Sequence, residues 1–130
     1  MGQKINAIYQ DAAREFARRV VSALRDEVDS IVLYGSTARG AAKSESDVDV
    51  LVISRDAGLT RDRLSQIRSD FTYQRNYAFF ISVVHYGREE FFGLSERGSP
   101  FIDELLAEGV ILNDNGTFSG IREGSARVSR

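Results

Sequence analysis

The sequence predicts a mixed α/β domain (α+β), in which a small sheet of about four strands is flanked by helices. Short apolar runs rich in β-forming residues recur along the chain, and between them lie longer segments whose apolar residues return at helical spacing. The chain has 130 residues, of which 42% are hydrophobic, which suffices for one core but leaves little material for a second. We therefore expect one domain over residues 1–113 and a flexible tail over residues 114–130.

The first helix is expected over residues 4–26. A second helix is expected over residues 61–73, after the breakers Gly58 and Thr60. Each should bury one apolar stripe, formed in the first by Ile5, Ile8, Ala12, Phe16, Val20 and Leu24, and in the second by Leu64, Ile67 and Phe71. Another face of the first helix carries Arg14, Arg18 and Arg25, and this pattern is typical of a solvated side, with a partner-binding stripe as the alternative.

Strands are expected over residues 31–34, 47–53, 77–86 and 110–112. The third of these is rich in β-formers on both alternating sets of residues, so we expect it to be buried on both faces over much of its length. A further helix should begin at Ser99 as N-cap, with proline at its first position, and end at Gly109.

Composition excludes several classes of protein. The formal charge of −2 does not favour a large nucleic acid as the main partner. The chain has no cysteine, no apolar signal region at its start and no apolar run near the roughly 18 residues of a membrane span. We therefore expect a soluble cytoplasmic protein.

Gly35 and Ser36 follow the strand predicted at 31–34 and predict a turn that grips phosphate. Glycine lacks a Cβ, so backbone amides there can approach an anion closely, and the Ser36 hydroxyl adds a donor. Thr37 and Arg39 should lie in a short helical turn whose free amides also face the anion. No Gly-Lys-Ser or Gly-Lys-Thr follows at Walker spacing, and no Gly-x-Gly-x-x-Gly fingerprint occurs.

Ten residues separate Ser36 from Asp47, and Asp47 and Asp49 lead the next strand. Side chains alternate in a strand, so the two carboxylates share one face, roughly 6 to 7 Å apart. At about 6 Å and an effective dielectric near 20 they repel by roughly 3 kcal/mol, which a divalent cation relieves. Magnesium suits such a site because it prefers hard oxygen ligands and substrate phosphates, and Mn²⁺ is the alternative.

The string from Tyr34 to Gly40, followed by Ser46-Asp47-Val48-Asp49, resembles the signature of the minimal nucleotidyltransferases in the DNA polymerase beta-like superfamily. The resemblance implies a nucleotidyltransferase domain over residues 1–113 that transfers AMP from ATP to an acceptor hydroxyl. It implies Asp47, Asp49 and Ser36 as catalytic residues, with Asp47 and Asp49 as the metal ligands. The nucleotide-binding residues that it implies are Gly35, Ser36, Thr37, Arg39 and Ser46.

The resemblance also implies a partner. Stand-alone members often pair with a helical HEPN-type protein, and some are antitoxins that adenylylate a tyrosine of that toxin. Two other functions stay open, namely a weakly active or inactive nucleotide-binding module that acts by binding its partner, and a nucleotidyltransferase for small molecules. A homo-oligomer also stays open.

The chain departs from its relatives at Ser82. Many members carry a third carboxylate on the third strand, and Ser82 stands at the corresponding position. Three explanations stay open. Asp49 itself activates the acceptor, a partner supplies the missing carboxylate, or catalysis is lost while nucleotide binding is retained. Glu89 and Glu90 are further acids near this strand, but we expect them to begin a helix and not to replace that carboxylate. His85, the only histidine, lies opposite to Ser82 by parity, so a structural role is favoured.

Overall fold

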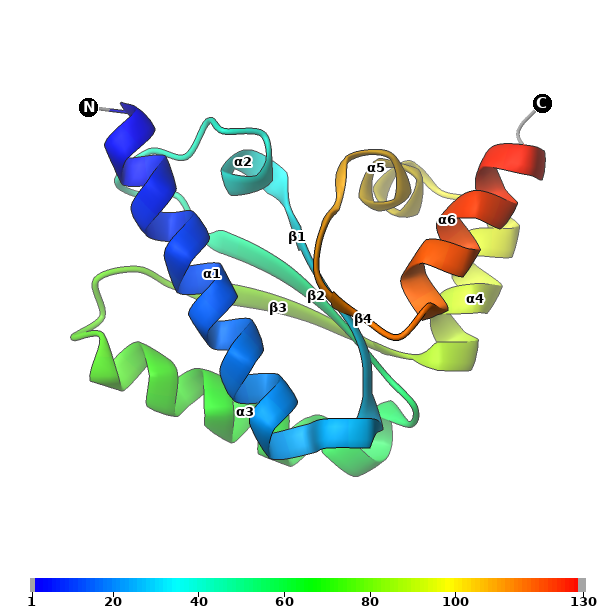
Figure 1. The fold of residues 1–130 in the computed structure, drawn as a ribbon, viewed down its shortest axis with the longest axis horizontal. Coiled ribbons are helices and arrows are strands. Elements are labelled where there is room, and N and C mark those ends of the chain that lie inside the picture. Colours follow the sequence, from blue (N-terminus) through cyan, green and yellow to red (C-terminus); the bar gives the residue numbers. More distant parts are fainter. Residues whose placement is uncertain (1, 129–130) are drawn as a thin grey trace.

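The structure is a computed structural model that describes residues 2–128. A four-stranded sheet of strand order β3-β2-β1-β4 lies between two layers of helices (Figure 1). The elements in chain order are α1 (Gly2–Leu24), the 3-10 turn η1 (Arg25–Glu27), β1 (Val28–Tyr34), α2 (Gly35–Ala38), β2 (Val48–Ser54), α3 (Ala57–Gln74), β3 (Ile81–Gly87), α4 (Arg88–Arg97), α5 (Pro100–Glu108), β4 (Val110–Asp114) and α6 (Thr117–Val128).

The sheet is mixed, which confirms the predicted fold class. Strand β1 pairs antiparallel with both β2 and β4, whereas β2 pairs parallel with β3. The parallel pair needs a crossover, and α3 provides it. Helices α1 and α3 cover one face of the sheet, and α4, α5 and α6 cover the other (Figure 1). None of the described helices is both long enough and apolar enough to cross a membrane.

Each face of the sheet has its own hydrophobic cluster. Under α1 and α3, Phe16 and Phe71 meet edge to face with ring centroids 5.7 Å apart. Under α4 and α6, Phe91 and Phe118 pack with centroids 6.1 Å apart. Successive residues of β1 and β2 feed the two clusters alternately, so these central strands are buried on both faces.

The predicted stripe of α1 is correct except at Ile8, whose side chain is 50% exposed. Tyr9 and Ala13 are buried instead, and both belong to the hydrophobic cluster under α1 and α3. Helix α3 begins at Ala57, four residues earlier than predicted, because Asp56 caps it by accepting a hydrogen bond from Gly58 N at 3.0 Å. Gly58 therefore lies in the first turn and does not break the helix.

The prediction for the third strand was wrong in two respects. Strand β3 begins at Ile81, since Asn76 and Tyr77 adopt left-handed backbone conformations with φ of 55° and 57° and turn the chain before it. It also lies at the edge of the sheet, where only Ile81 is fully buried and the following residues are half-buried. An apolar run therefore marked a strand correctly but not its place in the sheet.

The C-terminal part is more ordered than the expected tail. Helix α5 has the predicted cap, with Ser99 Oγ accepting from Ile102 N at 3.1 Å. Beyond β4 the chain forms α6, where Asp114 accepts hydrogen bonds from the amides of Phe118 and Ser119. Phe118 is fully buried, so α6 completes the second cluster and the expectation of a flexible tail from residue 114 is replaced. Residues 129 and 130 lie outside the described residues.

One ion pair ties this half of the molecule to the start of β1. The Asp29 side chain is fully buried and accepts two hydrogen bonds from Arg88, of 2.6 and 2.8 Å. Asn115 donates a third at 2.9 Å. These donors, Arg88 above all, hold the pKa of Asp29 below its usual value against the opposing effect of burial. The first turn of α4 and the link from β4 to α6 are thus anchored at one carboxylate.

Candidate active site

The turn after β1 brings the backbone directly against Asp49. Tyr34 is extended, and Gly35 then adopts a left-handed conformation with φ of 76° as it enters α2. A Cβ on Gly35 would overlap Asp49 Oδ2 and lie 3.2 Å from Asp49 Cγ. Glycine is therefore required here for two reasons, the backbone angle and the space taken by the carboxylate.

Asp47 and Asp49 lie at the start of β2 on the same end of the sheet as this turn. Strand β2 begins at Val48, so Asp47 immediately precedes it and is exposed, while Asp49 is half-buried. Burial raises the pKa of Asp49, the charge of Asp47 raises it further, and Arg39 opposes the shift. The two carboxylates are thus close enough to repel each other, as strand parity predicts.

Strand register places Ser82 beside Asp49. In the parallel ladder Asp49 pairs with Ser82 of β3, and in the antiparallel ladder it pairs with Tyr34 of β1. Paired residues of neighbouring strands point to the same face of the sheet. Within residues 2–128 no group of three or more histidine, cysteine or acidic side chains is arranged to hold a metal ion. The site therefore has two carboxylates, and Ser82 is the residue beside Asp49 on β3.

Tyr34 and helix α5 form the wall next to Asp49. The ring of Phe101, from α5, meets the Tyr34 ring edge to face with centroids 5.7 Å apart. Burial, assisted by the charge of Asp49, raises the pKa of Tyr34 to about 12. The Tyr34 hydroxyl is therefore neutral at physiological pH.

The other predicted nucleotide-binding residues have different surroundings. The Arg39 guanidinium reaches α5 and pairs with Glu104 at 3.2 Å and Glu108 at 3.4 Å. Thr37 is fully buried, and its hydroxyl has no hydrogen-bond partner among the described residues. Only the backbone of Thr37 is thus available to a ligand in this conformation.

Ser46 stabilises the loop between the two halves of the motif. Its hydroxyl accepts a hydrogen bond from Lys43 N at 2.9 Å, and its own amide donates to Lys43 O at 2.9 Å. Ser36 also contributes to the loop, since its carbonyl accepts from Ala41 N at 2.8 Å. The Ser36 side chain remains half-buried at the turn.

His85, Glu89 and Glu90 lie far from the acids. His85 faces α3, and its Nε2 lies 2.8 Å from Ser54 Oγ, which agrees with a structural role. Glu89 and Glu90 are in the first turn of α4, and Glu90 accepts from Gly87 N at 3.2 Å. Since α4 begins at the far end of β3 from Ser82, neither glutamate takes the place of the third carboxylate.

Three residues of α1 that the sequence interpretation missed hold the motif loop. Asn6 accepts a hydrogen bond from Ala42 N at 2.9 Å, Tyr9 donates to Ser44 O at 2.7 Å, and Gln10 donates to Thr37 O at 3.3 Å. Asn6 is 7% exposed. The sequence did carry a signal for Asn6, which is a polar residue on the apolar side of the helix. A buried side-chain amide needs a hydrogen-bond partner, so its position indicated a contact with another segment.

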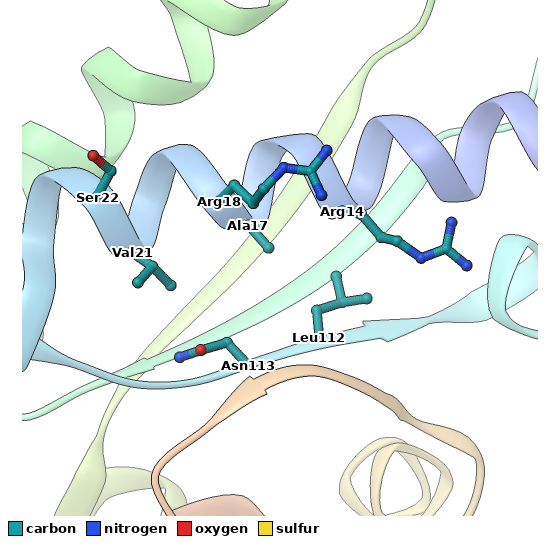
Figure 2. A pocket seen from close by; sticks show the side chains of 7 residues that line it. All are labelled: Arg14, Ala17, Arg18, Val21, Ser22, Leu112 and Asn113. Carbon is teal, nitrogen blue, oxygen red and sulfur yellow. The ribbon is translucent and has the colours of Figure 1, made fainter.

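A hollow lies away from the acids, between α1 and β4 (Figure 2). Its volume is about 450 Å³, and Arg14 and Arg18 stand at its rim. Both arginines already pair with acids of their own helix, Asp11 and Glu15. Arg25 is not among the lining residues and lies in η1, beyond the end of α1.

Gly35→Ala is expected to disable the site while leaving the fold intact. The left-handed conformation costs a non-glycine residue about 1–3 kcal/mol, and the new methyl group must displace Asp49. We expect a lower unfolding free energy and at least about a tenfold loss of nucleotide affinity, measured by chemical denaturation and calorimetry. Gly40→Ala is the matched control, since Gly40 also has positive φ, of 78°, but a Cβ there meets nothing within 4 Å. Equal nucleotide binding by the two variants would contradict the role of Gly35.

The chain is similar to known proteins. Residues 13–91 match the family described as Nucleotidyltransferase domain. A protein of Methanocaldococcus jannaschii named "Putative protein adenylyltransferase MJ0141" is 31% identical over 97 residues, which cover 75% of this chain and 91% of the relative.

Solved structures show the same fold. The crystal structure of a toxin-antitoxin with AMP-PNP has a TM-score of 0.59 at 12% identity and covers 89% of this chain and 86% of its own. That of the toxin-antitoxin MntA-HepT has a TM-score of 0.54 at 11% identity, with coverage of 92% and 86%. The family match and the archaeal relative together show that this chain belongs to the nucleotidyltransferase domain family of the DNA polymerase beta-like superfamily.

Proposed function

We propose that the protein transfers AMP from ATP to a hydroxyl of a protein partner, most specifically a tyrosine of a helical HEPN-type toxin. The observation that carries this is the contact of the glycine turn with Asp49, which puts a phosphate-binding backbone next to two carboxylates. The archaeal relative is named for protein adenylylation. Two of the similar structures are toxin-antitoxin complexes, one of them with an ATP analogue, which supports the choice of nucleotide and partner.

The residues present fit a magnesium ion. Asp47 and Asp49 supply hard oxygen ligands, and their mutual repulsion favours a divalent cation between them and the substrate phosphates. When bound, the ion supplies charge neutralisation and Lewis-acid polarisation of the phosphoryl group.

In the proposed reaction the protein mainly positions its substrates. Ser36 and the amides of the turn hold the terminal phosphates. The acceptor oxygen attacks the α-phosphorus, a new O–P bond forms, and the bond to the bridging oxygen breaks, so that pyrophosphate leaves. The acceptor proton cannot go to Ser82, which is no base at neutral pH. We propose that it passes to Asp49 or to a carboxylate of the partner.

The direct test is a transfer assay with purified protein, Mg²⁺ and the product of the neighbouring reading frame. We expect label from α-labelled ATP on the partner, with a mass increase of one adenylyl group, and none from γ-labelled ATP. EDTA should abolish the labelling. Absence of label on a folded partner that binds the protein would overturn the assigned acceptor, and label on small molecules without any partner would favour small-molecule transfer.

The serine at position 82 favours a second candidate, an inactive nucleotide-binding module that acts by binding its partner. This candidate predicts that calorimetry detects a non-hydrolysable ATP analogue but that no transfer occurs. It also predicts that complex formation and any cellular effect survive both Asp47→Ala and Asp49→Ala. Loss of the cellular effect in either variant, with the complex intact, would exclude it.

A further inference from the structure

A small cavity lies on the face of the sheet opposite to Asp49. Its volume is about 170 Å³, and it lies between α3 and the edge strand β3. A water molecule in the liquid takes up about 30 Å³, so there is room for a tetrahedral anion with a short substituent. The lining residues are Arg61, Leu64, Ser65, Arg68, Val83 and His85.

The polar groups that line this cavity can all donate hydrogen bonds, and none is a carboxylate. Arg61, Ser65 and Arg68 are spaced by four and three residues on α3, so they share one face of the helix. Two turns of helix, about 10.5 Å, separate the two arginine backbones, and their long side chains can converge on a ligand between them. Neither arginine makes an ion pair within the part of the chain that the structure describes.

His85 presents a donor as well. Its Nε2 lies 2.8 Å from Ser54 Oγ and 3.3 Å from Thr60 Oγ1, so this nitrogen already has hydroxyl partners within the protein. When one of these hydroxyls donates to Nε2, the neutral ring carries its proton on Nδ1. Burial lowers the pKa of His85, the nearby charge of Arg61 lowers it further, and Glu90 acts the other way. The ring is therefore a neutral donor at physiological pH.

From this arrangement we propose that the cavity is a binding site for a phosphoryl group, either inorganic phosphate or a small phosphate monoester. Two guanidinium groups provide the charge and the forked geometry that phosphate oxygens match. Ser65 and His85 provide neutral donors, and Leu64 and Val83 provide an apolar wall for a short substituent. The site is distinct from the proposed nucleotide site, because His85 is three residues beyond Ser82 along β3, about 10 Å, and points to the other face of the sheet.

The single histidine makes the test specific, since its ring NMR signals report on this cavity alone. The full chain, without Mg²⁺, is titrated with inorganic phosphate and with glycerol 3-phosphate, at a pH well above the ring pKa and at ionic strength held constant with chloride. We expect a saturable shift of the His85 signals. Arg61→Gln and Arg68→Gln should each weaken the binding at least about tenfold, as expected for loss of one charge-assisted contact.

Arg63→Gln is the matched control, because Arg63 is on the same helix but pairs with Glu27; binding should be unchanged. A preference for the monoester would identify the apolar wall as part of the site, and equal binding would identify the charges as sufficient. The proposal is overturned if the His85 signals do not respond to either phosphate, or if they respond in both cavity variants as strongly as in the unmodified protein. Phosphate binding that disappears only in Ser36→Ala would belong to the glycine turn and would also overturn it.

Discussion

Asp49→Asn is expected to reduce AMP transfer by at least about 100-fold while the protein stays folded. The substitution keeps the size of the side chain but removes the charge that faces Asp47 and the Gly35 turn. Loss of one group that stabilises charge in a transition state typically costs 10²–10³ in rate. The measurement is the rate of transfer from α-labelled ATP to the partner at saturating Mg²⁺. Since the pair no longer repels, the unfolding free energy should not fall.

Asp62→Asn serves as the control for this variant. Asp62 is an exposed residue of α3, on the far side of the sheet from the acids, and its neutralisation changes the net charge by the same amount. We expect transfer by this variant to match the unmodified protein. Similar losses in the two variants would mean that overall charge, and not the carboxylate pair, controls the reaction. Full activity of Asp49→Asn would refute the proposed role of Asp49.

Phe118→Ala is expected to destabilise the fold by about 3–5 kcal/mol, the usual cost of removing a fully buried phenylalanine. Phe118 has no exposed surface and packs against Phe91, and Arg122 lies over its ring with the guanidinium carbon 4.7 Å from the centroid. Denaturant unfolding followed by circular dichroism measures the change. A flexible segment at this position would contribute almost nothing, so the experiment distinguishes α6 from the tail that the sequence predicted.

The control is Phe92→Ala on α4, because the Phe92 side chain is 53% exposed. We expect a loss below about 1 kcal/mol, in line with the small effects of surface substitutions. If the Phe118 and Phe92 variants unfold at the same denaturant concentration, α6 is not part of the cooperative fold.

Local sequence determined the parts of the site that lie within a few residues of one another. Gly35 is favoured because its left-handed backbone angle strains most residues that carry a Cβ, and Asp47 and Asp49 share a face because side chains alternate along an extended chain. The caps of α3 and α5 are equally local, since Asp56 and Ser99 hydrogen-bond amides two or three residues away. The sequence interpretation used the Ser99 signal but took Gly58 as a break and so missed Asp56.

Tertiary structure alone decided which distant segments meet at these residues. Ser82 stands beside Asp49 because β2 and β3 pair in parallel with one register, and a slip of one residue would have turned Ser82 to the other face. Three other features have the same origin: β3 lies at the edge of the sheet, Arg39 pairs with α5, and Phe118 of α6 is buried. Each depends on the free energy of packing elements that are far apart in the chain, and a local pattern carries no information about the partner that will cover it.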